Sequence, residues 1–209
     1  MTYRIKEIFF TQQGEGKNTG KDFIFVRFSG CNLWSGKEKN RASAICSFCD
    51  TDFYGTDGIN GGKYQAKDLI EKIKSLWISA DNQIRVVLTG GEPLLQVDKG
   101  LISALKTENI YIAVETNGTL EAPDGIDWIC MSPKANTEIK LRKGSEVKVV
   151  YPQKNLNPDN FNVLDFKNFY IQPMDSKNYE DNVSQSVKYC MQNPNWKLSL
   201  QTHKILGIR

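Results

Sequence analysis

The chain has 209 residues, of which 40% are hydrophobic and 24% are charged, a composition typical of a globular protein with one substantial core. Its 27 basic and 24 acidic residues leave a net charge of +3, and their dispersal argues against a nucleic-acid partner, which needs clustered lysine and arginine. No apolar run could cross a bilayer and no signal peptide is recognisable, so we expect a cytoplasmic protein without a membrane partner, forming one domain over residues 1–209.

A polar, glycine-rich stretch and a short apolar run open the chain. Residues 11–22 (TQQGEGKNTGKD) predict a loop. They do not form a Walker phosphate loop, because Asp22 follows Lys21 where that motif requires serine or threonine. Residues 23–28 (FIFVRF) predict a buried strand. Arg27 lies within this strand, so its guanidinium needs a carboxylate partner, either from the protein or from a ligand.

Three of the five cysteines lie close together, with fourteen residues between Cys31 and Cys46 and two between Cys46 and Cys49. Thiolates at this spacing suit zinc or an iron–sulfur cluster. A structural zinc site usually has four protein ligands, and no fourth is evident. A [4Fe–4S] cluster with one iron open to a non-protein ligand is the other possibility, and unligated thiols are a third. The intervening residues 32–45 predict a solvated loop, and the two remaining cysteines are interpreted as structural.

Further along, strands alternate with helices. Residues 65–77 predict an amphipathic helix, and residues 101–105 lie in a second one. Strands are expected at 84–88, 110–114, 128–131, 147–150 and 169–171, with a final strand in the segment 198–209. This alternation predicts a mostly parallel α/β sheet with right-handed crossovers. Polar residues follow several of these strands directly, which predicts one shared site at the carboxyl edge of the sheet.

The cysteine triplet followed by Gly90-Gly91-Glu92-Pro93 resembles the radical S-adenosylmethionine (SAM) superfamily, although the usual spacing there is three and then two residues. The segments TQQGEG, RFSGCN, CDTDF, LTGGEP, ETNG, SPK, QPMD and QTHK resemble one branch of it. That branch converts 6-carboxy-5,6,7,8-tetrahydropterin to 7-carboxy-7-deazaguanine with loss of ammonia, a step toward queuosine and related deazapurines. The resemblance implies a partial TIM-like barrel of about six strands.

The resemblance also implies a set of site residues. Three thiolates would hold the [4Fe–4S] cluster, those of Cys31, Cys46 and Cys49. SAM would contact Phe48, Cys49, Asp50, Gly91, Glu92, Ser132, Pro133, Lys134, Gln172, Pro173, Met174 and Asp175. The pterin would contact Gln12, Gln13, Gly14, Arg27, Thr89 and the main-chain carboxylate of Arg209. Mg²⁺ would bind Thr51. No catalytic side chain is assigned, with Glu115 and His203 as secondary candidates. A homodimer and an electron donor such as flavodoxin or ferredoxin are also implied.

Two alternative functions remain open from the sequence. An activating enzyme that installs a glycyl radical on a partner protein would share the cysteines and the glycine turn. It would not need Arg27, the loop at 11–16 or residues 172–175. A zinc-binding module without catalysis is the other alternative, and it lacks a convincing fourth ligand.

Overall fold

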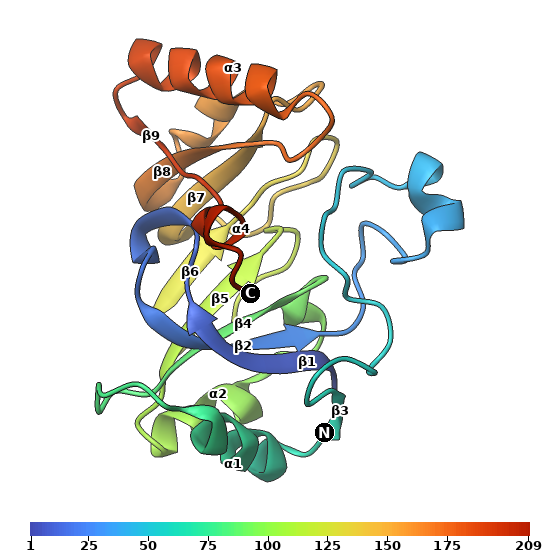
Figure 1. Ribbon diagram of the computed structural model, residues 1–209, viewed down its shortest axis with the longest axis vertical. Coiled ribbons are helices and arrows are strands. Elements are labelled where there is room, and N and C mark those ends of the chain that lie inside the picture. Colours follow the sequence, from blue (N-terminus) through green and yellow to red (C-terminus); the bar gives the residue numbers. More distant parts are fainter.

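The computed structural model describes residues 1–209 and contains one nine-stranded sheet with the order β3-β1-β2-β4-β5-β6-β7-β8-β9 (Figure 1). The strands are β1 Tyr3–Gln12, β2 Asp22–Phe28, β3 Gly62–Tyr64, β4 Arg85–Gly90, β5 Tyr111–Thr116, β6 Trp128–Met131, β7 Lys143–Tyr151, β8 Asp165–Pro173 and β9 Trp196–Leu198. All pairs from β2 to β9 are parallel, whereas β1 is antiparallel to both β2 and β3. The mostly parallel α/β prediction is confirmed. The sheet is open, with nine strands where about six were expected.

Helices cover the two ends of this sheet. The α-helices are α1 Ala66–Leu76, α2 Lys99–Thr107, α3 Tyr179–Gln192 and α4 Thr202–Leu206, and the 3₁₀ helices are η1 Gly16–Asn18, η2 Glu38–Ser43, η3 Pro93–Leu95 and η4 Pro158–Phe161. Helices α1 and α2 pack side by side near the N-terminal strands, and α3 packs on β8 at the other end (Figure 1). None of the helices is long and apolar enough to cross a membrane.

The hydrophobic core is divided between these two ends. The larger cluster has 18 buried residues and joins the apolar faces of α1 and α2 to β1, β2, β4 and β5. A second cluster of nine buried residues lies mainly between β7, β8 and their connections. Both core clusters pack against the faces of the sheet. The carboxyl ends of the parallel strands lie outside these clusters and can bear polar groups.

The C-terminal segment lies against the first loop of the chain. The Thr202 backbone N–H and hydroxyl both donate to the Gly14 carbonyl oxygen at 3.0 Å. The Thr11 hydroxyl donates to the main-chain oxygen of Arg209 at 2.6 Å. The segment 198–209 is therefore not the predicted strand. It begins at Leu198, the last residue of β9, and contains the short helix α4.

Candidate active site

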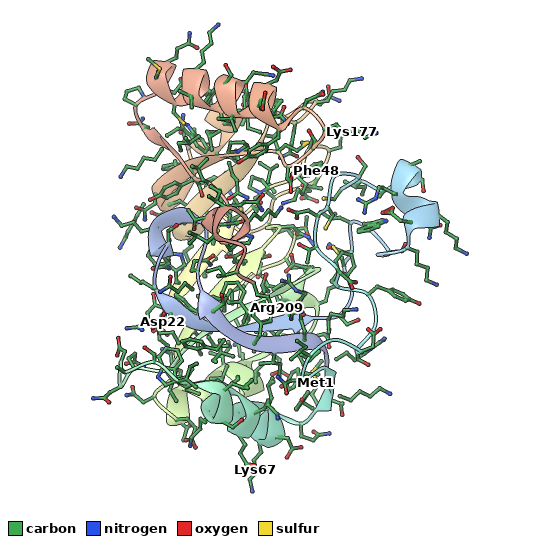
Figure 2. The ribbon with its side chains drawn as sticks, in the orientation of Figure 1. Met1, Asp22, Phe48, Lys67, Lys177 and Arg209 are labelled. Atoms are coloured by element: carbon green, nitrogen blue, oxygen red, sulfur yellow. The ribbon has the colours of Figure 1, made fainter.

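A cavity of about 340 Å³ lies where the carboxyl ends of the parallel strands meet the first loop, the cysteine stretch and the C-terminal segment. Every site residue predicted above lines it except Glu92 and Pro133. Figure 2 labels two of the lining residues, Phe48 from the cysteine stretch and Arg209 from the C-terminal segment. The structure thus brings into one cavity segments that are far apart in the sequence.

Three thiols border one part of the cavity, those of Cys31, Cys46 and Cys49. Hydrogen bonding by the Cys46 thiol lowers the pKa of Cys49 to about 6, while the same contact and burial raise the pKa of Cys46. The Leu33 backbone N–H donates to the Cys31 sulfur at 3.4 Å. The thiolate form is therefore favoured at Cys49, whereas burial raises the pKa of Cys31.

The donor set fits a [4Fe–4S] cluster better than a zinc ion. No three His, Cys, Asp or Glu side chains are arranged so that they could hold a single metal ion. A structural zinc site requires four ligands around one point. A [4Fe–4S] cluster places each thiolate on a different iron, so the three sulfurs need only border one cavity. Cys31, Cys46 and Cys49 would therefore hold the cluster.

The glycine turn after β4 packs directly on the loop that carries the first cysteine. A Cβ added to Gly91 would lie 2.1 Å from the Gly30 carbonyl oxygen and 2.8 Å from the Cys31 Cβ. Any larger residue would push these two segments apart. The motif thus brings main-chain groups of the turn next to the cysteine loop.

Glu92 has a different place from the one predicted. Its side chain is fully buried, and its two oxygens accept hydrogen bonds from the Leu94 and Asn117 backbone N–H groups at 3.0 and 2.8 Å and from the Thr116 hydroxyl at 2.8 and 2.9 Å. Burial raises the pKa of Glu92, and this effect outweighs the hydrogen bonds, which act to lower it. The carboxylate does not reach the cavity. It joins the turn after β4 to the end of β5.

Changing Glu92 to glutamine is expected to destabilise the protein by about 1–3 kcal/mol, because an amide N–H₂ would replace an oxygen that faces hydrogen-bond donors. Urea unfolding of the cluster-free protein would measure this loss. Glu121→Gln, at an exposed position without side-chain hydrogen bonds, is the control and should leave the free energy of unfolding within about 0.5 kcal/mol. Equal stability of the two variants would contradict the assigned role.

Arg27 lies on β2 and borders the cavity. Its Nε donates to the Glu7 carboxylate at 2.8 Å, so the protein supplies the carboxylate partner that the sequence required. Its two terminal nitrogens make no hydrogen bond to the protein. The other Glu7 oxygen pairs with Arg209 Nη1 at 3.0 Å, and that guanidinium lies 5.4 Å from the Phe9 ring centroid. Glu7 therefore holds two arginines at the edge of the cavity.

Lys204, which the sequence analysis did not single out, forms a bridge on the opposite side. Its Nζ lies 2.5 Å from Asp50 and 2.6 Å from Asp175. Burial alone would raise the pKa of Asp50, but the hydrogen bond and charge of Lys204 outweigh it and lower that pKa. The Thr51 hydroxyl lies 3.5 Å from an Asp50 oxygen. Helix α4 thereby joins two of the predicted cofactor-binding carboxylates.

Ser132 and Lys134 line the cavity, whereas Pro133 does not. Lys134 Nζ donates to the Ser132 carbonyl and hydroxyl oxygens at 2.6 and 2.8 Å. The Pro133 carbonyl instead accepts from Gln153 Nε2 at 3.3 Å.

On the loop at 11–22, a Cβ on Gly14 would lie 2.2 Å from His203 Nδ1, so the lack of a side chain at Gly14 lets α4 approach.

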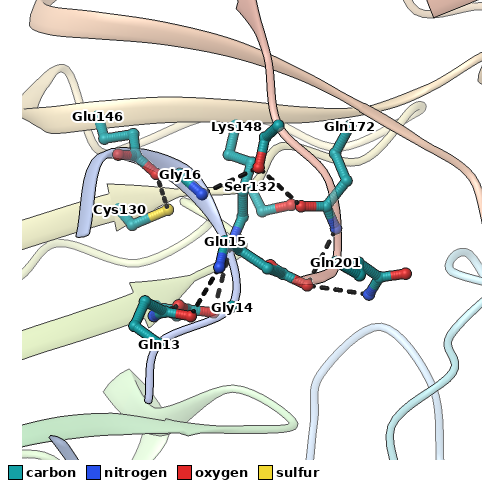
Figure 3. A network of polar contacts seen from close by, with 12 residues as sticks. Gln13, Gly14, Glu15, Gly16, Cys130, Ser132, Glu146, Lys148, Gln172 and Gln201 are labelled. Carbon is teal, nitrogen blue, oxygen red and sulfur yellow. Dashed lines mark hydrogen bonds and ion pairs between the residues drawn. The ribbon is translucent and has the colours of Figure 1, made fainter. Parts of the chain in front are cut away.

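A buried lysine lines the cavity, and Figure 3 shows it within a network of polar contacts. Lys148, on β7, is 3% exposed and pairs with Glu15 and, at 3.6 Å, with Glu115. The Glu15 carboxylate also accepts hydrogen bonds from Gln172 Nε2 at 3.1 Å and Gln201 Nε2 at 2.9 Å. These contacts connect the first loop, the strands β5, β7 and β8, and the C-terminal segment through one network.

Electrostatics holds this network in its charged form. Burial alone would raise the pKa of Glu15, but the charge and hydrogen bond of Lys148 outweigh it and lower that pKa. Burial alone would lower the pKa of Lys148, but the acidic groups around it raise it well above its ordinary value. Gln13 Nε2 donates to Glu115 at 2.8 Å, so a predicted substrate-binding residue is positioned by the same network. A lysine within the apolar run VKVVY was the available signal for it.

Comparisons with known proteins agree with this geometry. Residues 40–143 match the family model described as the radical SAM superfamily. The chain is 53% identical to 7-carboxy-7-deazaguanine synthase of Caulobacter vibrioides and 53% identical to that of Bradyrhizobium diazoefficiens, in both cases over 100% of each protein. The crystal structure of QueE from Escherichia coli superposes with a TM-score of 0.68 at 25% identity, covering 96% of this chain and 94% of that one. The chain belongs to the 7-carboxy-7-deazaguanine synthase family within the radical SAM superfamily.

Proposed function

We propose that this chain converts 6-carboxy-5,6,7,8-tetrahydropterin to 7-carboxy-7-deazaguanine with loss of ammonia, in the biosynthesis of deazapurines such as queuosine. The observation that carries the proposal is that one cavity is bordered by the three thiols, by the glycine turn and by the loop Gln12–Gly14 together with Arg27. Full-length identity of 53% to enzymes of this name supports the same reaction.

The cluster and SAM, when bound, supply the 5′-deoxyadenosyl radical that removes hydrogen from C6 of the pterin. Phe48 and Gly91 would contact SAM near the cysteines, and the segments 132–134 and 172–175 would form the rest of its pocket. The protein's part is to fix the reacting groups close together and to exclude water from them. The walls of the cavity are suited to this because their polar groups are held by internal hydrogen bonds.

Arg27 would bind the carboxylate of the substrate. Its Nε is held by Glu7, and its two terminal nitrogens are left for a ligand. Two parallel N–H donors match a carboxylate in a way that lysine cannot copy. Gln12, Gln13 and Gly14 would contact the heterocycle, because amide groups can both donate to and accept from its edge.

Changing Arg27 to lysine is therefore expected to lower kcat/KM for the pterin by about 10- to 100-fold, the equivalent of about 1.5–3 kcal/mol for a charged hydrogen bond. SAM cleavage measured without the pterin should stay near the wild-type rate. Arg142→Lys, at an exposed arginine without side-chain hydrogen bonds, is the control. Equal kcat/KM values for the two variants would argue against carboxylate binding by Arg27.

Other parts of the proposal concern ions, proton transfer and partners. Thr51 would be the protein ligand of Mg²⁺, which is supported by its hydroxyl at the cavity wall. Thr89, the Arg209 main-chain carboxylate, Glu115 and His203 would face the substrate, and all four residues line the cavity.

The reaction needs an electron donor, for which flavodoxin or ferredoxin is proposed. One continuous sheet supports a single domain, and a homodimer is proposed from the family resemblance alone.

The test is direct. The protein would be purified and reconstituted with iron and sulfide without oxygen, then incubated with SAM, reductant, Mg²⁺ and the carboxytetrahydropterin. Mass spectrometry should detect 7-carboxy-7-deazaguanine. SAM cleavage without consumption of the pterin would overturn the proposed substrate, while leaving the superfamily assignment intact and favouring an activating enzyme.

A further inference from the structure

The insertion between the first two cysteines is partly built into the protein, contrary to the predicted solvated loop. Residues 32–45 contain the 3₁₀ helix η2 and two buried side chains, Leu33 and Trp34. The Trp34 ring packs edge-on against Phe53, with a centroid distance of 5.5 Å and an interplanar angle of 89°. Phe53 lies four residues after Cys49, so the insertion packs against the segment that follows the last cysteine.

One side chain of the insertion reaches the turn that carries the last two cysteines. Arg41 Nη1 donates to the carbonyl oxygens of Ser47 at 2.9 Å and Cys49 at 3.0 Å. The same guanidinium lies 4.1 Å from the Trp34 ring centroid, and its Nε lies 2.6 Å from the Glu38 carboxylate. All the contacts of this side chain are thus made either within the insertion or with the turn at 46–49.

These contacts restrain the turn in a particular way. A guanidinium is a rigid fork, so donation from one nitrogen to two carbonyls fixes their mutual orientation. Those carbonyls flank Phe48 and include that of Cys49 itself. Stacking on the buried Trp34 keeps the fork from rotating away. The turn therefore has a support that a spacing of three residues between the first two cysteines could not supply.

We infer that Arg41 is a positioning residue for the cluster ligands, which holds the Cys46–Cys49 turn in its ligand-bearing conformation and so determines how firmly the cluster is retained. Groups that orient metal ligands typically change metal affinity or activity by about 10- to 100-fold when they are removed. The inference rests on the radical SAM assignment and does not depend on the identity of the pterin substrate.

The test compares three variants of the full chain. Arg41→Gln removes the charge and the fork, Arg41→Lys keeps the charge without the fork, and Lys39→Gln removes a charge from the same insertion at an exposed side chain without hydrogen bonds or ion pairs. Hydrogen–deuterium exchange of the peptide 46–51 in the cluster-free protein reports the motion of the turn. The rate of iron loss to a chelator reports retention in the reconstituted protein.

Arg41→Gln is expected to accelerate both exchange of this peptide and iron loss by about tenfold. Arg41→Lys should fall between it and the wild type, and Lys39→Gln should match the wild type. Equal rates for Arg41→Gln and Lys39→Gln would overturn the inference. If Arg41→Gln lowers the unfolding temperature of the whole chain, the result for Arg41→Lys tests the inference instead. Faster exchange of the peptide 46–51 in Arg41→Lys, at an unchanged unfolding temperature, supports the positioning role, and exchange at the wild-type rate refutes it. None of these measurements uses the pterin.

Discussion

Replacing Lys148 by methionine is expected to lower the free energy of unfolding by about 3–5 kcal/mol, since removal of one partner from a buried ion pair leaves an uncompensated charge. In this case Glu15 and Glu115, which are both partly buried, would lose their cation. Urea unfolding of the cluster-free protein measures the loss. Lys143→Met, at an exposed position on the same strand, is the matched control and should change stability by less than about 0.5 kcal/mol.

The loss should depend on pH in a defined direction. Without Lys148, burial is opposed mainly by the hydrogen bond from Gln201, and we expect burial to prevail, so that the pKa of this carboxyl rises above its unfolded value. The folded variant then holds this proton more firmly than the unfolded chain does, so raising the pH removes stability. The difference between wild type and Lys148→Met should therefore be smallest near pH 5 and grow toward pH 8.

A second substitution tests whether the two charges act as a pair. Glu15→Gln in the Lys148→Met background removes the unpaired carboxylate, and it is expected to recover about 1–3 kcal/mol. The recovery should be larger at pH 8 than at pH 5. A double variant that shows the sum of the two single losses, or a loss that is independent of pH, would contradict the buried pair as the cause.

Changing Cys49 to alanine is expected to abolish SAM cleavage. Only two of the three thiolates that border the cavity would remain, and an iron–sulfur cluster normally requires three or four cysteines. Iron content and the visible absorbance of the anaerobically reconstituted protein should both fall to background levels. These measurements separate loss of the cluster from loss of a later step.

The matched control is Cys190→Ala. Cys190 lies in α3 beside the second core cluster and does not border the cavity. This variant should keep the wild-type iron content and rate of cleavage. Retained cleavage by Cys49→Ala would refute the assignment of the cluster ligands.

The sequence was informative where apolar runs end in polar residues. All six strands expected between residues 23 and 171 are present, and polar residues that follow several of them meet at one cavity. Strand β1 was missed because Lys6 and Glu7 interrupt its apolar pattern. In the fold Lys6 is buried against Asp52 and Asp57. Partners about 50 positions away cannot be inferred from local patterns.

Helix α3 was missed for a similar reason, since its inner face is partly polar. Asn182 and Ser186 are its buried residues. Asn182 Nδ2 donates to the Met174 carbonyl oxygen at 2.8 Å, and the Ser186 hydroxyl donates within the helix at 2.7 Å. A helix that buries hydrogen-bonded polar groups lacks the apolar stripe on which prediction depends. Lys148 escaped notice likewise, because the two carboxylates with which it pairs, Glu15 and Glu115, come from distant parts of the chain.

The contacts between the first loop and the C-terminal segment have a consequence for the order of folding. The bond between Thr202 and Gly14 spans 188 positions, and the bond between Thr11 and Arg209 spans 198. Closing such long loops is entropically costly, so these contacts are expected to form after the sheet and its helices. Helix α4 buries no residue completely, and such a segment opens at low free energy. Ligands are therefore expected to enter by detachment of the chain's last turn while every strand stays paired.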